Sequence, residues 1–120
     1  MCGVIGIYSK SEVNKKLFFG LNSLQHRGQE SCGITVSNGE NLHREKGMGL
    51  VIDVFKEENL NNLVGNVGIG HVRYSTAGGS HDYNTQPLMA FAKGIEMSLA
   101  HNGNLINHQI LRTRPVSYTH

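Results

Sequence analysis

The sequence predicts an α+β domain in which antiparallel sheet dominates. Three observations support this. An apolar strand pattern begins at residue 3, one amphipathic helix follows it, and the rest is mostly short strand-like runs separated by glycine turns. The order of one strand, one helix and then hairpins favours α+β over alternating α/β. With 120 residues the chain has room for one domain, because domains typically span about 100–150 residues.

The first elements are a strand and a helix. Residues 3–8 form a short apolar strand. Ser9 and Glu12 then have the spacing of a capping box, and apolar residues recur at helical intervals until the helix ends near Gly28. Gly28 either ends the helix in a left-handed conformation or belongs to the wall of a pocket.

A hairpin and a second helical segment come next. The β-branched run 33–37, the dipeptide Asn38-Gly39 and the run 42–46 predict a hairpin with a two-residue turn. Cys32 precedes this strand as a core residue. Residues 50–63 predict a helix.

The second half predicts another strand, a loop and a second hairpin. Residues 67–74 alternate as a strand does, and the polar stretch 75–87 predicts a functional loop. The runs 88–91 and 95–101 form the hairpin, around Lys93-Gly94. A helix capped by Asn107 would end before Pro115.

Composition excludes several classes of protein. A net charge of +2 is too small to indicate a nucleic-acid or anionic-membrane partner. No apolar run approaches the ~20 residues of a membrane span. Two cysteines, Cys2 and Cys32, are too few for a disulfide scaffold or a four-cysteine metal site, so we expect no metal in this segment and a cytoplasmic location.

Cys2 is the first candidate for chemistry. Removal of Met1 would make it the N-terminal residue, with a nucleophilic thiol and a free α-amine on one residue. The amine has an ordinary pKa of about 7.7–8.0, which suits a general base near neutral pH. Position alone favours the other interpretation, in which Cys2 is only a small apolar residue that opens a strand.

Two further motifs carry groups that suit catalysis or substrate binding. The turn His101-Asn102-Gly103-Asn104 offers a side-chain amide and an unhindered backbone N–H, the donors that a tetrahedral oxyanion needs. Arg73 lies at a strand end beside the polar loop, and its guanidinium suits a substrate carboxylate. Alone, the first is an ordinary β-turn and the second a solvated arginine.

Taken together and in order, the segments CGVIGIY, SLQHRGQESCGI, GHVRYSTAG and LAHNGNL closely resemble the class II glutamine amidotransferase domain. The resemblance covers residues 2–112. Within the class, the segments HRGQES and HVRYSTAGG are most similar to those of the amidophosphoribosyltransferase family. The glucosamine-6-phosphate synthase family typically has YRGYDS and HTRWATHG there.

This resemblance implies a four-layer αββα sandwich of the N-terminal nucleophile hydrolase type, with Cys2 at the edge of a central strand. It implies that Cys2 attacks the carboxamide of glutamine, and that Asn102 and Gly103 stabilise the oxyanion. Arg73 would hold the α-carboxylate, and Tyr74 and Thr76 would shape the pocket. The ammonia released would convert phosphoribosyl pyrophosphate to phosphoribosylamine, the first step of purine synthesis, in a further domain.

The resemblance also implies what this segment lacks. The family's glutaminase domain is roughly twice as long, and its Asp for the substrate α-amino group has no counterpart here. Mg²⁺ and, in some members, an iron–sulfur cluster belong to the full-length family, and their ligands are absent from this segment. We therefore expect an incomplete, inactive segment of an enzyme that is a homo-oligomer at full length. Residues 113–120 do not match the family and are interpreted as a non-native tail.

Two alternatives remain at this point. The chain could be an inactive regulatory or binding module that keeps the fold. It could also be the glutaminase domain of another class II amidotransferase, such as glucosamine-6-phosphate synthase.

Overall fold

The computed structural model describes residues 2–74 and 84–103. In this part, four antiparallel strands form a sheet in the order β1-β4-β2-β3, and two further strands form the hairpin β5-β6. The elements in chain order are β1 (Gly3–Tyr8), α1 (Asn14–Ser23), the 3-10 turn η1 (Gln25–Arg27), β2 (Ser31–Ser37), β3 (Leu42–Met48), α2 (Val51–Val54), α3 (Glu57–Asn61), β4 (Val67–Arg73), β5 (Leu88–Ala92) and β6 (Ile95–Leu99).

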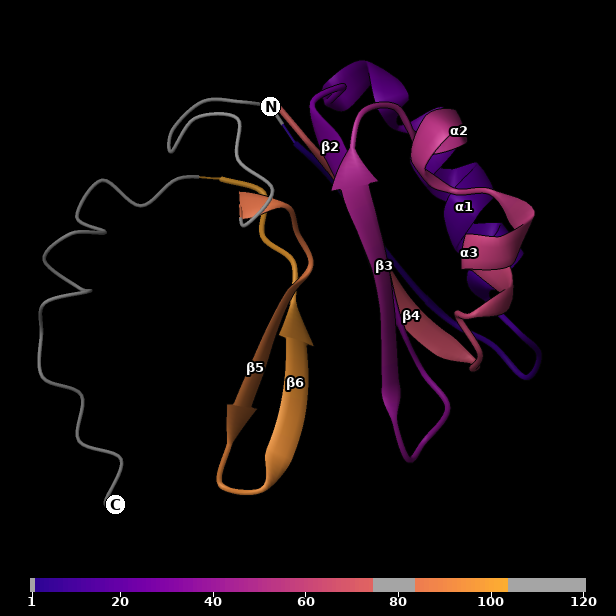
Figure 1. Cartoon of the computed structure of the whole chain (residues 1–120), viewed down its shortest axis with the longest axis vertical. Helices are drawn as coiled ribbons and strands as arrows, with labels where there is room; N and C mark the ends of the chain where they lie inside the picture. Colours follow the sequence, from indigo (N-terminus) through magenta and orange to yellow (C-terminus); the bar gives the residue numbers. More distant parts are fainter. Residues whose placement is uncertain (1, 75–83, 104–120) are drawn as a thin grey trace, which may run out of the picture.

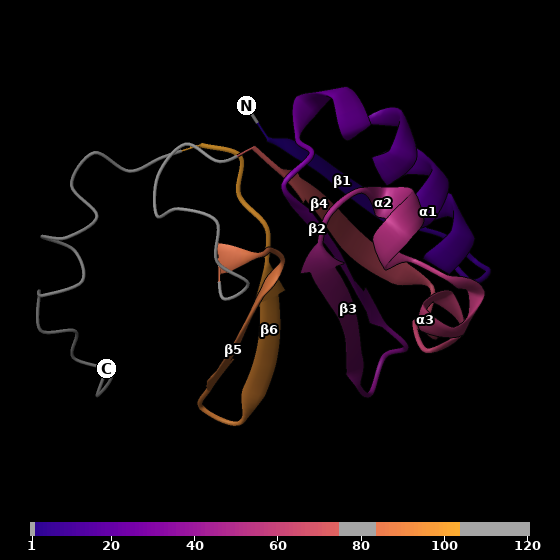
Figure 2. The same ribbon diagram turned by 45° about the horizontal axis from the view of Figure 1, so that its top comes forward.

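The described part has three layers. The helices cover one face of the four-stranded sheet, and the hairpin lies on the opposite side (Figures 1 and 2). Ser98 of β6 joins the layers, because its hydroxyl lies 2.8 Å from that of Thr35 on β2. The expected α+β class is confirmed, and one helical layer with two sheet layers corresponds to an incomplete αββα sandwich. Among the described strands β1 is an edge strand, and β4 and β2 are central.

The core lies between α1 and the sheet. Leu17 and Leu21 of α1 are completely buried. They sit directly over Gly68 and Gly70 of β4, where a Cβ atom would lie 2.7 Å from Leu17 Cδ1 and 3.0 Å from Leu21 Cδ1. The two glycines therefore let the helix pack close to the sheet.

The predicted start of the first helix is wrong. The helix begins at Asn14, and Ser9 and Glu12 do not form a capping box. Glu12 instead accepts a hydrogen bond of 2.7 Å from the backbone N–H of Gly65, which lies before β4. A contact between distant segments has replaced the local one.

The predicted left-handed Gly28 is also wrong, because its φ of −174° and ψ of 130° are extended. The requirement for glycine here is steric. A Cβ atom on Gly28 would lie 2.5 Å from the carbonyl carbon of Arg73. Gly28 therefore lets the segment after α1 approach the end of β4, and its place in the wall of a pocket stays a prediction.

The first hairpin is longer at its turn than predicted. Ser37 pairs with Leu42, so residues 38–41 form a four-residue loop rather than a two-residue turn. The Asn38 side-chain oxygen accepts hydrogen bonds from the backbone N–H groups of Glu40 and Asn41, at 2.9 and 2.8 Å. This Asx-type arrangement competes with the tight turn that Asn-Gly favours.

The single helix predicted over 50–63 is two short helices, α2 and α3. The chain is extended at Phe55 and Lys56 between them. Phe55 is buried at this break, with 3% of its surface exposed. The helix is interrupted here, and the aromatic ring of Phe55 is buried instead. The second hairpin forms as predicted, although β6 ends at Leu99 rather than at residue 101.

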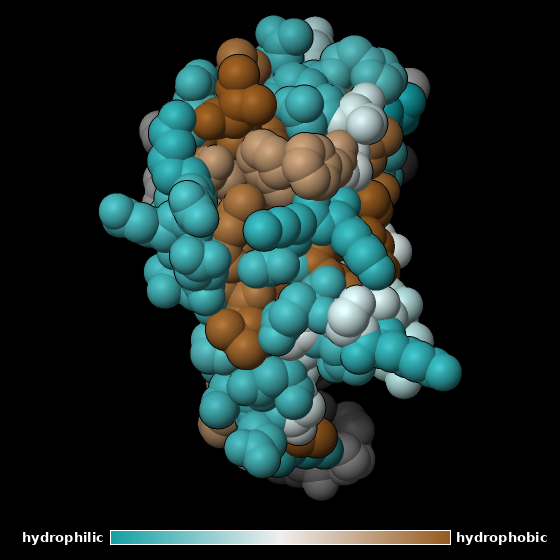
Figure 3. Space-filling model, turned by 90° about the vertical axis from the view of Figure 1, so that its right-hand side faces the viewer, coloured by the Kyte–Doolittle hydropathy of each residue, from teal (hydrophilic) through white to brown (hydrophobic). Residues whose placement is uncertain are grey.

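The helical side of the molecule is mainly hydrophilic. Seen from this side, teal side chains surround a few brown patches (Figure 3). The exposed apolar residues of the helices include Phe19 and Ile52, which are 64% and 53% exposed. Within residues 2–74 and 84–103, no helix has the length and apolar character needed to cross a membrane.

Replacing Leu21 with alanine should lower the free energy of unfolding by about 2–5 kcal/mol, because the change leaves a cavity between α1 and β4. Phe19→Ala, on the exposed side of the same helix, should change it by less than about 0.5 kcal/mol. Chemical denaturation of the full-length protein, followed by circular dichroism, measures both. Equal effects of the two substitutions would contradict the assigned packing of α1.

Candidate active site

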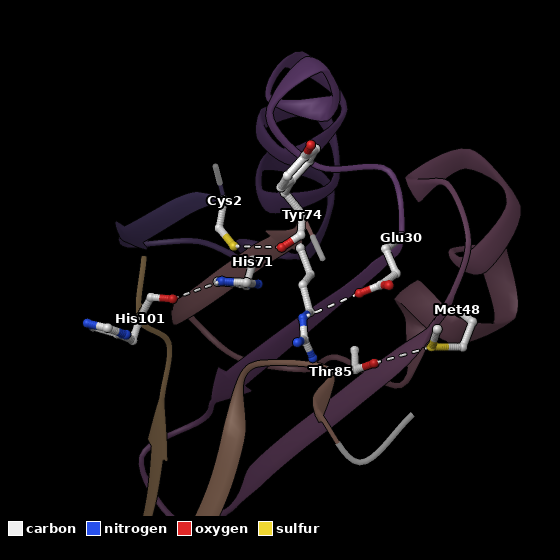
Figure 4. A network of polar contacts seen from close by, with 8 residues as sticks. Cys2, Glu30, Met48, His71, Tyr74, Thr85 and His101 are labelled. Atoms are coloured by element: carbon white, nitrogen blue, oxygen red, sulfur yellow. Dashed lines mark hydrogen bonds and ion pairs between the residues drawn. The ribbon is translucent and has the colours of Figure 1, made fainter. Parts of the chain in front are cut away.

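The candidate site lies at the C-terminal end of β4. Strands β1 and β4 pair antiparallel with Gly3 opposite Val72, so Cys2 lies beside the last residues of β4 although about 70 residues separate them in sequence. The Cys2 sulfur lies 3.9 Å from the carbonyl oxygen of Tyr74 (Figure 4). Cys2 is half-buried and its thiol is free. A nucleophile needs this combination of fixed backbone and access.

Arg27 fixes the backbone of Cys2 from the helical side. It ends the 3-10 turn that follows α1, and its Nε donates a hydrogen bond of 3.0 Å to the Cys2 carbonyl oxygen. Arg27 belongs to the segment SLQHRGQESCGI that carries the family resemblance, but the sequence did not indicate its contact with Cys2. Only the folded structure reveals this hydrogen bond, because residues 2 and 27 are far apart in sequence and meet only where the helix packs on the sheet.

Arg73 is held in an ion pair. It is 8% exposed, and its Nε lies 3.4 Å from Oε2 of Glu30 (Figure 4). The backbone N–H of Glu30 also donates to the Arg73 carbonyl at 3.1 Å. A buried guanidinium needs a carboxylate partner, and Glu30 orients its plane. Glu30 lies in the segment SLQHRGQESCGI, but the sequence did not predict this role.

The predicted oxyanion turn follows β6. Asn102 and Gly103 are exposed, and Gly103 has a φ of 151°, which favours glycine. The preceding residue, His101, is joined to β4 through its carbonyl oxygen, which lies 3.0 Å from Nε2 of His71 (Figure 4). Both Cys2 and the turn are therefore attached to the same end of β4.

The comparisons with known proteins agree with this arrangement. The chain matches the family described as class-II glutamine amidotransferases over residues 1–120. The chain belongs to this family. Its similarity to the class-II amidotransferases thus includes Cys2, the Arg73 region and the turn at residues 101–103.

Among the curated proteins, the chain is similar to amidophosphoribosyltransferases. The amidophosphoribosyltransferase of Methanocaldococcus jannaschii is 53% identical over 114 residues, which are 93% of this chain and 24% of that protein. The amidophosphoribosyltransferase of Synechocystis is 52% identical over 112 residues, 92% of this chain and 23% of that protein. The chain spans about a quarter of the length of these curated relatives.

Two solved structures share the fold. One is described as the allosteric regulatory enzyme of purine biosynthesis; it has a TM-score of 0.83 and 41% identity, and the match covers 99% of this chain and 27% of that one. The other is glutamine phosphoribosylpyrophosphate amidotransferase from B. subtilis, complexed with ADP and GMP. It has a TM-score of 0.81 and 42% identity, and the match covers 93% of this chain and 24% of that one.

The structure brings most of the predicted site residues to one region of the molecule. Cys2, Arg73 and Tyr74 lie at one end of β4, and the turn with Asn102 and Gly103 is tied to that strand. Tyr74 presents its backbone carbonyl to Cys2, while the residue itself is 54% exposed. Thr76 lies outside the described residues, as do the helix expected from Asn107 and the tail 113–120.

The described residues of this amidotransferase segment do not fit a metal ion or cluster. No group of three histidine, cysteine or carboxylate side chains gathers within residues 2–74 and 84–103. Of the two cysteines, Cys32 is buried in β2, apart from the half-buried Cys2 at the end of β1.

The two thiols should differ sharply in reactivity. Burial raises the pKa of Cys32 to about 12, so only about one thiol in ten thousand is ionised there at pH 8. Brief iodoacetamide treatment at pH 8 should add one carbamidomethyl group at Cys2, as seen by peptide mass spectrometry. Cys32→Ser should keep this adduct and Cys2→Ser should lose it. Preferential labelling of Cys32 would contradict the structure.

Proposed function

We propose that this chain provides the glutaminase site of an amidophosphoribosyltransferase. The observation that carries the proposal is the placement of the Cys2 thiol at the end of β4, the strand that also carries the buried Arg73 and that is joined through His71 to the turn after β6. Membership of the class-II glutamine amidotransferases supports glutamine as the substrate.

The first half-reaction forms a thioester. After removal of Met1, the α-amine of Cys2 takes the thiol proton, directly or through water. The thiolate attacks the side-chain carboxamide carbon of glutamine, and the negative charge moves to the carboxamide oxygen. The side-chain N–H of Asn102 and the backbone N–H of Gly103 stabilise this oxyanion. The intermediate collapses as the α-ammonium returns a proton to the departing nitrogen, which leaves as ammonia.

The second half-reaction restores the thiol. Water, deprotonated by the α-amine, attacks the γ-glutamyl thioester and releases glutamate. Arg73 binds the α-carboxylate of glutamine throughout, with its guanidinium plane oriented by Glu30. The family resemblance assigns Tyr74 and Thr76 the role of shaping the glutamine pocket. These contacts position the carboxamide over the sulfur.

The fate of the ammonia follows from the named relatives. Ammonia would displace pyrophosphate from phosphoribosyl pyrophosphate and give phosphoribosylamine, the first step of purine synthesis. The residues for this transfer lie in sequence that the matched relatives have and this chain does not span. Their names favour this acceptor over the sugar phosphate of glucosamine-6-phosphate synthase.

The location and assembly of the enzyme belong to the same proposal. A reducing compartment such as the cytoplasm keeps the Cys2 thiol available, although plant relatives of this family are described as chloroplastic. We further propose that the full-length enzyme is a homo-oligomer.

Cys2→Ala in the full-length protein should abolish glutamine hydrolysis, because the nucleophile is lost. Glutamate release by the wild-type and variant proteins measures this, with Cys32→Ala as the matched control that retains activity. An N-terminal mass should show that Met1 is absent. Retained Met1 would favour the inactive module instead. Unchanged hydrolysis by the Cys2→Ala variant would show that Cys2 is not the nucleophile.

Asn102→Ala should lower kcat for glutamine hydrolysis by about 10²–10³ because one oxyanion donor is lost. KM should change little, since this hydrogen bond strengthens only as the charge develops. Steady-state kinetics of the full-length protein separate the two constants. A large rise in KM with unchanged kcat would assign Asn102 to ground-state binding and remove it from the oxyanion site.

A further inference from the structure

We propose that His71 and Gln86 are positioning residues that together clamp the backbone of His101, and so hold the adjacent oxyanion donors in place. This inference rests on the proposed function of Asn102 and Gly103. It concerns two side chains that the reaction itself does not use.

His71 holds the carbonyl side of the clamp. It lies on β4, is completely buried, and has its Nε2 atom 3.0 Å from the His101 carbonyl oxygen. A carbonyl oxygen only accepts hydrogen bonds, so Nε2 must carry the proton. Burial lowers the pKa of His71, and the hydrogen bond to His101 opposes this only in part. The ring is therefore neutral at physiological pH, with its single N–H directed at His101.

Gln86 holds the amide side of the clamp. Its Oε1 atom accepts a hydrogen bond of 2.6 Å from the backbone N–H of His101. Gln86 is itself seated on the sheet, because a Cβ atom on Gly33 of β2 would lie 2.3 Å from the Gln86 carbonyl oxygen. Beside it, Thr85 is completely buried, with its hydroxyl 3.6 Å from the Met48 sulfur of β3 (Figure 4).

The clamp acts where the regular pairing of the hairpin ends. The last pair of the β5-β6 ladder is Leu88 with Leu99, so the ladder does not reach His101. Both backbone polar groups of His101 are instead bound by side chains anchored on the four-stranded sheet. A fixed backbone at His101 limits the directions in which the Asn102 side chain and the Gly103 backbone N–H can point.

The geometry of the turn depends closely on His101. The φ of 151° at Gly103 is one that side-chain-bearing residues rarely adopt, and a Cβ atom there would lie 3.2 Å from Cε1 of the His101 ring. Oxyanion donors must be held to within about 0.5 Å of the productive position. Loosening the His101 backbone should therefore weaken stabilisation of the transition state more than substrate binding.

The test compares variants that remove or retain each hydrogen bond in the full-length protein. His71→Met and Gln86→Met remove the donor and the acceptor at similar volume, whereas His71→Gln and Gln86→Glu retain them. Thr35→Val is the matched control, because it deletes the partly buried hydrogen bond between β2 and Ser98 of β6 without touching His101. Circular dichroism and thermal melting establish that each variant is folded under the assay conditions.

Two measurements decide the outcome. Hydrogen–deuterium exchange at the His101 amide should accelerate at least about tenfold in both methionine variants and remain near the wild-type rate in Thr35→Val. For glutamine hydrolysis, kcat should fall by about 10–100-fold, below the loss expected for a deleted oxyanion donor, with KM within about twofold of wild type. The retaining variants should recover most of both properties.

The two proposals fail in different ways. Unchanged exchange at His101 in the methionine variants overturns the clamp, whatever the activity. Faster exchange with unaltered kcat overturns its positioning role. If the wild-type protein does not hydrolyse glutamine, the proposed function fails, whereas the exchange measurement still decides whether His71 and Gln86 fix the turn.

Discussion

The candidate site depends first on the antiparallel pairing of β4 with its two neighbours. Its pairing with β1, which sets Gly3 opposite Val72, brings the N-terminal thiol to the end of β4. Its pairing with β2, which sets Ser31 opposite Arg73, brings Glu30 to the same end. A shift by one residue in either register would turn the side chains of that strand to the other face. Backbone hydrogen bonds of the same strand therefore fix the positions of Cys2 and Arg73 relative to each other.

Glycines at the packed surfaces let neighbouring segments lie close to β4 and β2. Gly68 and Gly70 let α1 lie on one face of β4, and Gly33 lets the backbone of Gln86 lie on β2. Gly28 lets the segment after α1 approach the backbone of Arg73. At each place a side chain would need space that backbone or buried leucines occupy. The high glycine content thus reflects layers that approach closely, and not only turns.

Local patterns predicted the type of each main element but not several of their ends. Apolar and β-branched runs, turn dipeptides and the alternation of residues 67–74 identified all six described strands, and helical periodicity identified the first helix. The capping box at Ser9, the two-residue turn at Asn38 and the continuous helix over 50–63 failed. In each case a contact replaced the local preference: Glu12 with Gly65, the Asn38 side chain with its own loop, and Phe55 with the core.

The sequence by itself determined the chemical groups: a thiol at residue 2, a guanidinium at residue 73 and an amide-bearing turn at residues 102 and 103. Their ordered motifs were enough to indicate the family, since residue type and spacing are local properties. Only the tertiary structure decided that Arg27 binds the Cys2 carbonyl, that Glu30 pairs with Arg73, and that two side chains bind His101. These contacts join segments far apart in the chain, and they exist only once strand order and register are fixed.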